Sequence, residues 1–305
     1  MKQSKKILIA NRGVIAIRAL RAARELGYSV ASVYSTIDRD QKHLKLSDEA
    51  ICIGPPETKD SYLNEAAIIS AAELSGADAI YPGFGFLAEN ASFAEKCRES
   101  GFKFIGPDPE VIAIMGDKIK AKELAKSLNI PVVPGYEGEI STENEAIKIV
   151  EEIGYPVIIK ASAGGGGRGM RVVNSSDELW QSIQSAQNEA ELAFGDGKIF
   201  IEKYLKKPRH IEVQIFGNGK GEAVHLFTRD CSLQRKYQKI VEEAPALNID
   251  NQKLEEIQNL SVEACKKLNY EGAGTIEFLY ENNDFYFIEM NTSCLLYTSP
   301  SPRDQ

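Results

Sequence analysis

The sequence predicts an α/β and α+β protein, in which a Rossmann-like parallel-sheet domain is followed by an α+β domain. Up to residue 105, short β-branched runs alternate with stretches of helical periodicity, which is typical of a parallel sheet with helical crossovers. Beyond residue 198, strands follow one another through short connections, which is typical of an antiparallel sheet. At 305 residues, the chain is long enough for two or three domains.

Composition narrows the class of protein. Hydrophobic residues make up 43% and charged residues 26%, which is ordinary for a soluble globular protein. A net charge of −8 opposes nonspecific binding to nucleic acid or to an anionic membrane. No apolar run is long enough to span a bilayer, and Met1–Lys6 lacks the apolar core of a signal peptide. The five cysteines are far apart and match no metal spacing, which suits a reducing cytoplasm. From the charge, the apolar runs and the cysteines together, we expect a cytoplasmic protein without nucleic-acid or membrane partners.

The N-terminal elements follow from the hydrophobic pattern. The expected strands are Lys6–Ala10, Ser29–Tyr34, Ala77–Tyr81 and Lys103–Ile105. The expected helices are Val14–Leu26, Asn64–Leu74 and Ala91–Ser100. Gly83–Ala88 matches a dinucleotide-binding fingerprint in its letters, but it lies in the third βα unit and carries two phenylalanines in the turn. We interpret it as a loop where the sheet meets the next domain.

The second half of the chain begins after a proline-punctuated linker, Ile130–Gly135, which composition marks as a domain boundary. Helical stretches are expected around Met115–Lys118, from Thr142 onward, and over Ser176–Phe194. The expected strands are Val157–Ile159, Met170–Val173, Lys198–Glu202, His210–Phe216, Ala223–Phe227, Lys239–Glu243, Ala273–Tyr280 and Phe285–Asn291.

The stretch Val157–Met170 combines a buried strand, a lysine and a run of glycines. Lys160 follows the β-branched run, and four glycines begin at Gly164. Glycines let backbone N–H groups approach an anion closely, because no Cβ intervenes. The segment lacks the Gly-Lys-Ser/Thr ending of a Walker A loop. We interpret it as a hairpin that grips phosphate, with a flexible surface loop as the alternative.

The last two strands predict a metal site. A loop of Asn282–Asp284 places Glu277 directly opposite Glu289, with Asn291 two residues further on. The same register gives an apolar face with the pairs Ile276–Met290, Phe278–Ile288 and Tyr280–Tyr286. Like charges across a strand pair are destabilising, and a divalent cation between them reverses that cost. We therefore expect removal of one carboxylate to leave the metal-free stability unchanged or slightly raised. Two solvated glutamates on an exposed face are the alternative.

Together, these motifs resemble biotin carboxylase. They are Ile9–Gly13, Tyr81–Asn90, Met115–Lys118, Lys160–Met170, Glu202–Leu205, Arg229–Arg235, Gln238–Pro245 and Phe287–Thr292. The resemblance runs from the start of the chain to Thr292, and it implies an ATP-grasp fold in which two lobes clamp ATP. It also implies an N-terminal domain over 1–113, an incomplete ATP-grasp domain over 114–292 and a family C-terminal domain that is missing.

The resemblance further implies the residues of the site. Phosphate contacts fall on Lys118, Lys160, Gly166 and Gly167. The adenine edge falls on Glu202, Lys203 and Leu205, and the nucleotide site is also lined by His210, Gln234 and Tyr237. Metal ligands are Glu277, Glu289 and Asn291, and bicarbonate falls on Lys239. Without the resemblance, Lys118, Lys239 and His210 would be interpreted as ordinary surface groups.

The chain departs from the family pattern at several positions. The family has Tyr at Phe84, His at Tyr237 and Glu at Val14. It also has a catalytic arginine where this chain has Ser293, followed by a stretch with the glutamate that deprotonates bicarbonate. Residues 293–305 are instead rich in serine and proline without periodicity, and we interpret them as sequence foreign to the protein.

The activity implied by the resemblance is that of an ATP-dependent carbon–nitrogen ligase with Mg²⁺ or Mn²⁺. It carboxylates biotin on a biotin carboxyl carrier protein, using bicarbonate, and a carboxyltransferase then uses the carboxyl group. The expected acceptor is acetyl-CoA, for fatty acid biosynthesis, with propionyl-CoA or pyruvate as alternatives. A homodimer is usual in the family. This chain is expected to bind Mg·ATP but to be inactive. The alternative to the enzymatic assignment is a nucleotide-binding ATP-grasp fragment without turnover. Another ATP-grasp ligase fits the motifs before Lys118 less well.

Overall fold

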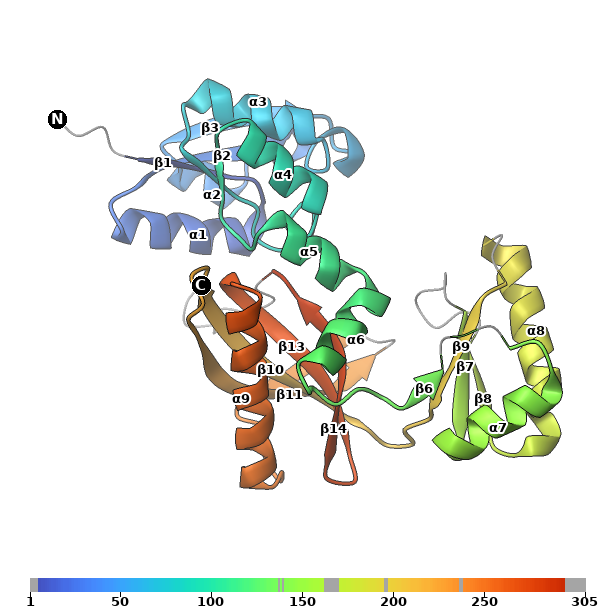
Figure 1. The fold of residues 1–305 in the computed structure, drawn as a ribbon. Coiled ribbons are helices and arrows are strands. Elements are labelled where there is room, and N and C mark those ends of the chain that lie inside the picture. The colour runs from blue at the N-terminus through green and yellow to red at the C-terminus, as the bar shows by residue number, and fades with distance from the viewer. Residues whose placement is uncertain are drawn as a thin grey trace.

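The structure is a computed structural model that describes residues 5–136, 138, 140–161, 170–194, 197–235 and 238–293. Figure 1 shows three bodies: an N-terminal α/β body, a central sheet covered by a long helix, and a smaller lobe to the side. Within the described residues, none of the helices combines the length and the apolar character that crossing a bilayer requires.

The N-terminal body is a parallel five-stranded sheet of order β3-β2-β1-β4-β5. Its strands are β1 (Lys6–Ile9), β2 (Ser29–Ser35), β3 (Glu49–Gly54), β4 (Ala79–Tyr81) and β5 (Lys103–Phe104). Its helices are α1 (Gly13–Glu25), α2 (Lys42–Leu46), α3 (Glu65–Ser75) and α4 (Ala91–Glu99), with short 3₁₀ turns at Thr36–Asp38 and Thr58–Asp60. The four expected strands and three expected helices are confirmed, whereas β3 and α2 were not predicted.

Helices cover both faces of this sheet. Neighbouring residues of a strand point to opposite faces, and both faces carry apolar side chains that need burial. Leu8 lies in the core formed with α3 and α4, and Ile9 lies in the core formed with α1. The segment Gly83–Ala88 is a turn before α4, as predicted, and Asn11 Nδ2 donates to the carbonyl oxygens of Pro82 (2.7 Å) and Phe84 (2.8 Å).

Two helices, α5 (Pro109–Gly116) and α6 (Lys118–Ser127), connect the N-terminal body to the rest. Within α5, Ile112 packs in the N-terminal core, while Val111 and Met115 pack in the core of the central sheet. The proline-punctuated segment then runs along the central sheet, where Phe287 N donates to Pro131 O at 2.7 Å. It leads to β6 (Gly135–Tyr136) and the smaller lobe.

The smaller lobe is a four-stranded sheet of order β6-β9-β7-β8, with α7 (Glu143–Ile153) and α8 (Ser176–Phe194). Its other strands are β7 (Val157–Ala161), β8 (Arg171–Val173) and β9 (Ile199–Lys203). The antiparallel pairing of β7 with β8 confirms the predicted hairpin. The lobe has its own core, which includes Val157, Ile159, Leu179 and Ile201.

The central sheet is antiparallel, as predicted, with the order β12-β11-β10-β13-β14. Its strands are β10 (Arg209–Asn218), β11 (Ala223–Arg235), β12 (Gln238–Glu243), β13 (Glu271–Glu281) and β14 (Asp284–Asn291). The helix α9 (Asn251–Lys267) covers one face and was not predicted. Its signal was present, because Ile257, Ser261, Ala264 and Cys265 share a buried face and Asp250 caps its first turn.

The register of the last hairpin is only partly as predicted. The confirmed pairs are Ile276–Met290 and Glu277–Glu289. The pairs Phe278–Ile288 and Tyr280–Tyr286 are wrong, because the observed pairs are Phe278–Phe287 and Tyr280–Phe285. The metal hypothesis depends on the confirmed part of the register.

Two compensating features explain the difference. The turn has two residues instead of three, because Asn282 (φ 53°) and Asn283 (φ 69°) both adopt the left-handed conformation that such a hairpin turn requires. A bulge at Ile288 then absorbs one residue and returns Glu289 to its place opposite Glu277.

Candidate active site

The face of the central sheet opposite α9 is polar although it is buried. Strand alternation sends Ile211, Val213 and Ile215 into the apolar core. The intervening residues therefore point to the other face, where Glu212 is 1% exposed and Gln214 is 2% exposed. A buried polar face needs a partner for each charge, because an unpaired charge is costly away from water.

Three carboxylates lie in one row across this face. Glu212 of β10 is the register partner of Glu277 of β13, and Glu277 is the register partner of Glu289 of β14. Side chains directly opposite in neighbouring strands share a face, so the row concentrates negative charge. The sequence analysis identified Glu277 and Glu289 but missed Glu212.

Two long basic side chains compensate Glu212 and Glu277. Arg229 Nη2 donates to Glu212 Oε2 at 2.8 Å, and its Nη1 donates to Gln214 Oε1 at 2.9 Å. Lys239 Nζ pairs with Glu212 and lies 2.7 Å from Glu277 Oε1. The bicarbonate lysine expected from the resemblance thus lies between two carboxylates.

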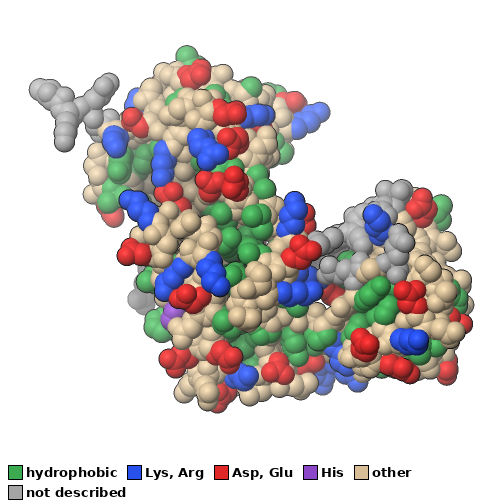
Figure 2. Space-filling view, viewed as in Figure 1, with side chains coloured by type: hydrophobic (Ala, Val, Ile, Leu, Met, Phe, Trp, Pro, Cys, Tyr) green, Lys and Arg blue, Asp and Glu red, His purple; other side chains and the backbone are tan. Residues whose placement is uncertain are grey.

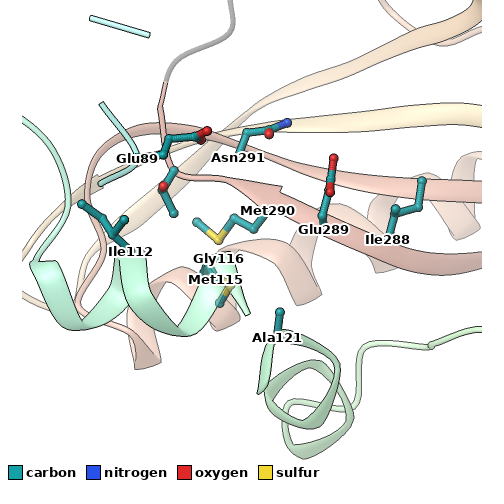
Figure 3. Close-up of a pocket in the computed structure, with 10 residues that line it drawn as sticks. Glu89, Ile112, Met115, Gly116, Ala121, Ile288, Glu289, Met290 and Asn291 are labelled. Atoms are coloured by element: carbon teal, nitrogen blue, oxygen red, sulfur yellow. The ribbon is translucent and has the colours of Figure 1, made fainter. Parts of the chain in front are cut away.

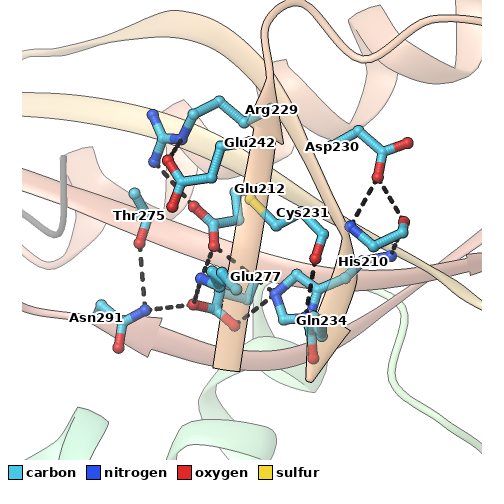
Figure 4. A network of polar contacts seen from close by, with 12 residues as sticks. His210, Glu212, Arg229, Asp230, Cys231, Gln234, Glu242, Thr275, Glu277 and Asn291 are labelled. Carbon is cyan, nitrogen blue, oxygen red and sulfur yellow. Dashed lines mark hydrogen bonds and ion pairs between the residues drawn. The ribbon is translucent and has the colours of Figure 1, made fainter. Parts of the chain in front are cut away.

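His210 extends the network to Gln234, as shown in Figure 4. Its Nε2 lies 2.7 Å from Glu277 Oε2, and its Nδ1 lies 3.1 Å from Gln234 Nε2. An amide nitrogen only donates, so Nδ1 accepts and the ring carries its proton on Nε2, facing Glu277. Gln234 is itself held, because its Nε2 also donates to Cys231 O at 2.9 Å.

Glu277 stays ionised in this setting. Burial raises the pKa of its carboxyl group, but His210 and Lys239 lower the pKa by more than burial raises it, and the net pKa is about 2. Asn291 adds a donor, because its Nδ2 lies 2.5 Å from Glu277 Oε1. Its Nδ2 also lies 3.3 Å from Thr275 Oγ1.

A pocket of about 140 Å³ lies beside the end of β14. Glu289 and Asn291 line it, together with Met115 of α5 and Glu89 of the loop before α4 (Figure 3). Glu89 Oε1 accepts a hydrogen bond from Ser293 N at 3.3 Å, so the N-terminal body holds the segment that follows β14.

The donor set fits a hard divalent cation. Glu277 and Glu289 face the same side across the strand pair, and Asn291 offers an amide oxygen while its nitrogen is bonded to Glu277. His210, Glu212 and Glu277 also place one ligand atom each within 4.8 Å of one another. Glu277 belongs to both groups, and Lys239 pairs with it in either; in the second group, Arg229 and Lys239 also balance Glu212, so that group attracts a cation less.

A second cluster lies in the smaller lobe, around Glu202 of β9. Lys160 Nζ, at the end of β7, lies 2.5 Å from Glu202 Oε2, and Lys122 of α6 pairs with the other carboxylate oxygen. Burial raises the pKa of Glu202, but Lys160 and Lys122 lower it below its usual value. Sequence reasoning placed Lys160 and Glu202 at the site but did not find Lys122.

Other expected residues have different contacts or lie outside the described part. Lys203 Nζ donates to the carbonyl oxygens of Gly154 and Tyr155, both at 2.9 Å, and thus fastens the end of α7 to β9. Leu205 is half-buried just after β9. Gly166, Gly167, Tyr237 and the Lys118 side chain fall outside the described residues.

Figure 2 shows the surface hollowed between the N-terminal body and the smaller lobe.

Comparison with known proteins identifies the family. Residues 3–112 match the family model of the biotin carboxylase N-terminal domain. Residues 117–296 match that of the carbamoyl-phosphate synthase L chain, ATP binding domain. The biotin carboxylase of Pseudomonas aeruginosa is 55% identical over 288 residues, which cover 94% of this chain. The chain belongs to the biotin carboxylase family.

The chain spans 64% of the length of that biotin carboxylase. The crystal structure of a Campylobacter jejuni biotin carboxylase–β,γ-ATP complex matches with a TM-score of 0.85 and 50% identity, over 97% of this chain and 66% of that one. The biotin carboxylase domain dimer of the Hydrogenobacter thermophilus 2-oxoglutarate carboxylase, in complex with MgADP, ADP and bicarbonate, matches with a TM-score of 0.82 and 46% identity, over 97% and 66%. The predicted α/β and ATP-grasp fold class is confirmed.

Proposed function

We propose that the protein to which this chain belongs carboxylates biotin on a biotin carboxyl carrier protein, using ATP and bicarbonate. One observation supports this most strongly: five residues that the resemblance assigns to the site converge on one buried sheet face. They are His210, Gln234, Lys239, Glu277 and Asn291. Each of the five strands β10 to β14 supplies one of them, so the convergence is a property of the fold and not of one sequence motif.

The phosphates of ATP are proposed to contact Lys118 and Lys160 and the backbone of Gly166 and Gly167. A lysine at a strand end is suited to this role, because its compact charge can follow a phosphate oxygen. The adenine edge is proposed to lie along the end of β9 and the residues that follow it, at Glu202, Lys203 and Leu205, and Tyr237 is proposed to line the nucleotide site. The related structures were solved with β,γ-ATP and with MgADP, which supports nucleotide binding by this fold.

Mg²⁺ or Mn²⁺ held by Glu277, Glu289 and Asn291 would, when bound, screen the phosphate charges. Lys239 is proposed to hold bicarbonate, since its ammonium group lies where the carboxylate row meets β12. His210 keeps Glu277 ionised and oriented through its Nε2 proton. ATP would phosphorylate bicarbonate, giving ADP and carboxyphosphate. Carboxyphosphate would then split into CO₂ and phosphate, and a ring nitrogen of biotin would lose its proton and bond to the CO₂.

For the 305-residue chain itself, we propose Mg·ATP binding without biotin carboxylation. Ser293 stands where the family has a catalytic arginine, and serine supplies neither its charge nor its reach. The loss of one preorganised donor of this kind typically lowers a rate by ~10²–10³. The alternative to the enzymatic assignment is a nucleotide-binding ATP-grasp fragment without turnover.

The wider assignments are also proposals. We propose a division into 1–113, 114–292 and 293–305, a carboxyltransferase partner, a homodimer and a cytoplasmic location. The described cysteines, Cys52, Cys97, Cys231 and Cys265, are free thiols, which suits a reducing compartment. Acetyl-CoA is the proposed acceptor; the related 2-oxoglutarate carboxylase shows that the acceptor varies within the family, so propionyl-CoA and pyruvate are the alternatives to assay.

Calorimetric titration of the chain with Mg·ATP tests the proposal. Lys160→Ala is expected to weaken ATP binding by roughly ten- to a hundredfold, because a charge-assisted phosphate contact contributes a few kcal/mol. Lys148→Ala, on α7 of the same lobe, is the matched control and is expected to leave the affinity unchanged. Equal affinity of the folded Lys160→Ala variant and the unaltered chain would refute the phosphate role. Biotin-dependent ATP hydrolysis equal to that of the P. aeruginosa relative would refute the proposed inactivity.

A further inference from the structure

Glu202 is shared by two lysines that come from different parts of the fold. Lys160 reaches it from β7 in the smaller lobe, at 2.5 Å. Lys122 reaches it from α6, which packs on the central sheet. The Glu202 side chain is 6% exposed and that of Lys122 is 17% exposed, so the three groups form a largely buried charge cluster.

An aromatic ring brings the two ammonium groups to the same place. Lys122 Nζ lies 5.1 Å and Lys160 Nζ lies 5.7 Å from the centroid of Phe200, two residues before Glu202 on β9. The ring attracts cations through its face. The two lysines are therefore held next to each other, with one carboxylate between them.

The sharing matters because the proposed function needs Lys160 on the phosphates of ATP. Moving Lys160 away from Glu202 removes one of its two cations. A buried carboxylate that loses its counter-ion is strongly destabilised. Lys122 reduces this energetic cost, because Glu202 keeps one paired cation after Lys160 has moved to the nucleotide.

We propose that Lys122 is a positioning residue of the nucleotide site, which holds Glu202 so that Lys160 can exchange this carboxylate for the phosphates. The proposal rests on the proposed ATP-binding function. Lys122 acts through Glu202 and Lys160 and needs no contact of its own with ATP. It also ties α6, which begins at Lys118, to the strand that connects the smaller lobe to the central sheet.

The test is a double-mutant cycle measured by calorimetric titration with Mg·ATP. Lys122→Met is expected to weaken ATP binding about tenfold, because Lys160 then becomes the main counter-ion of a buried carboxylate. In the Glu202→Gln background no charge needs compensation, so the same change is expected to alter the affinity less than about twofold. Lys122→Arg keeps the cation and is expected to stay within about twofold of the unaltered chain. Lys126→Met, at an exposed position on α6, is the control for helix effects.

Each outcome decides a different question. If Lys122→Met loses the same affinity in the unaltered chain and in the Glu202→Gln background, the proposal is overturned, because the lysine would then act directly on ATP or on the fold. No loss with Glu202 present would overturn it as well. If the unaltered, folded chain does not bind Mg·ATP, the proposed function fails, and the role of Lys122 fails with it.

Discussion

Glu277 is an ionised carboxylate with almost no contact with water. It is 3% exposed, and nitrogen atoms of Lys239, His210 and Asn291 all lie within 2.7 Å of its oxygens. The sequence pattern suggested that its neighbour Glu289 would repel it and that removing either would not reduce stability. The structure gives a reason to expect otherwise for Glu277, because Lys239 and His210 compensate its charge.

Glu277→Gln is therefore expected to lower the free energy of unfolding without metal by about 1–3 kcal/mol, since Lys239 and His210 lose a charged acceptor inside the protein. Glu289→Gln is the matched variant on the neighbouring strand, and it is expected to cost less than half as much. Both are expected to weaken Mn²⁺ binding in the presence of nucleotide. Urea denaturation and metal titration measure the two effects, and equal destabilisation by the two variants would contradict this assignment of the charges.

At the scale of elements, the sequence predicted most strands and the pairing of Glu277 with Glu289, since alternation and β-branched runs are local signals. It could not predict the bulge at Ile288, because a bulge depends on how a whole strand fits its neighbour. Arg229 and Lys122 were missed for a similar reason. Their partners, Glu212 and Glu202, are distant in sequence, and only the folded sheets bring them together.

The turn of the last hairpin provides a test of this account. Asn283→Ala is expected to lower the free energy of unfolding by about 1–2 kcal/mol, because alanine resists the φ of 69° and cannot accept the hydrogen bond from Tyr280 Oη at 2.9 Å. Asn283→Gly keeps the backbone conformation and loses only the hydrogen bond. Glycine should thus be the less damaging of the two in thermal or urea denaturation. A glycine variant as unstable as the alanine variant would show that backbone strain is not what asparagine relieves.

For the whole molecule, the arrangement of cores indicates which bodies unfold together. The N-terminal body and the central sheet share α5, whose residues Ile112 and Met115 pack into different cores. The smaller lobe has a separate core, which includes the partly buried Trp180, the only tryptophan in the sequence. Tryptophan fluorescence therefore reports on the smaller lobe, and far-ultraviolet circular dichroism reports mainly on the rest.

Asp38 allows the N-terminal body to be weakened selectively. Its Oδ2 accepts hydrogen bonds from Ser35 Oγ (2.8 Å), Tyr62 Oη (2.8 Å) and Arg12 Nη1 (2.9 Å). Burial raises the pKa of this carboxyl group, but the three donors together lower the pKa by more than burial raises it. The folded-state pKa therefore lies below the usual value. A lowered pKa stabilises the fold above the unfolded-state value of about 3.9, and the stabilisation is lost as the pH falls through the folded-state pKa.

Asp38→Asn is expected to lower the stability of the N-terminal and central bodies by about 1–3 kcal/mol at pH 7, because a buried, charged acceptor is lost. The difference from the unaltered chain is expected to shrink as the pH falls below about 4, because the unfolded chain then takes up a proton at this carboxyl group, and to vanish once the pH passes the lower folded-state pKa. In urea denaturation, the midpoint from circular dichroism should move, while the midpoint from Trp180 fluorescence should stay in place, because the smaller lobe has its own core. Asp177→Asn, at the start of α8, alters the smaller lobe instead. It should therefore move the midpoint from Trp180 fluorescence and leave the midpoint from circular dichroism in place. Equal shifts of both probes in Asp38→Asn would show that all three bodies unfold as one cooperative unit.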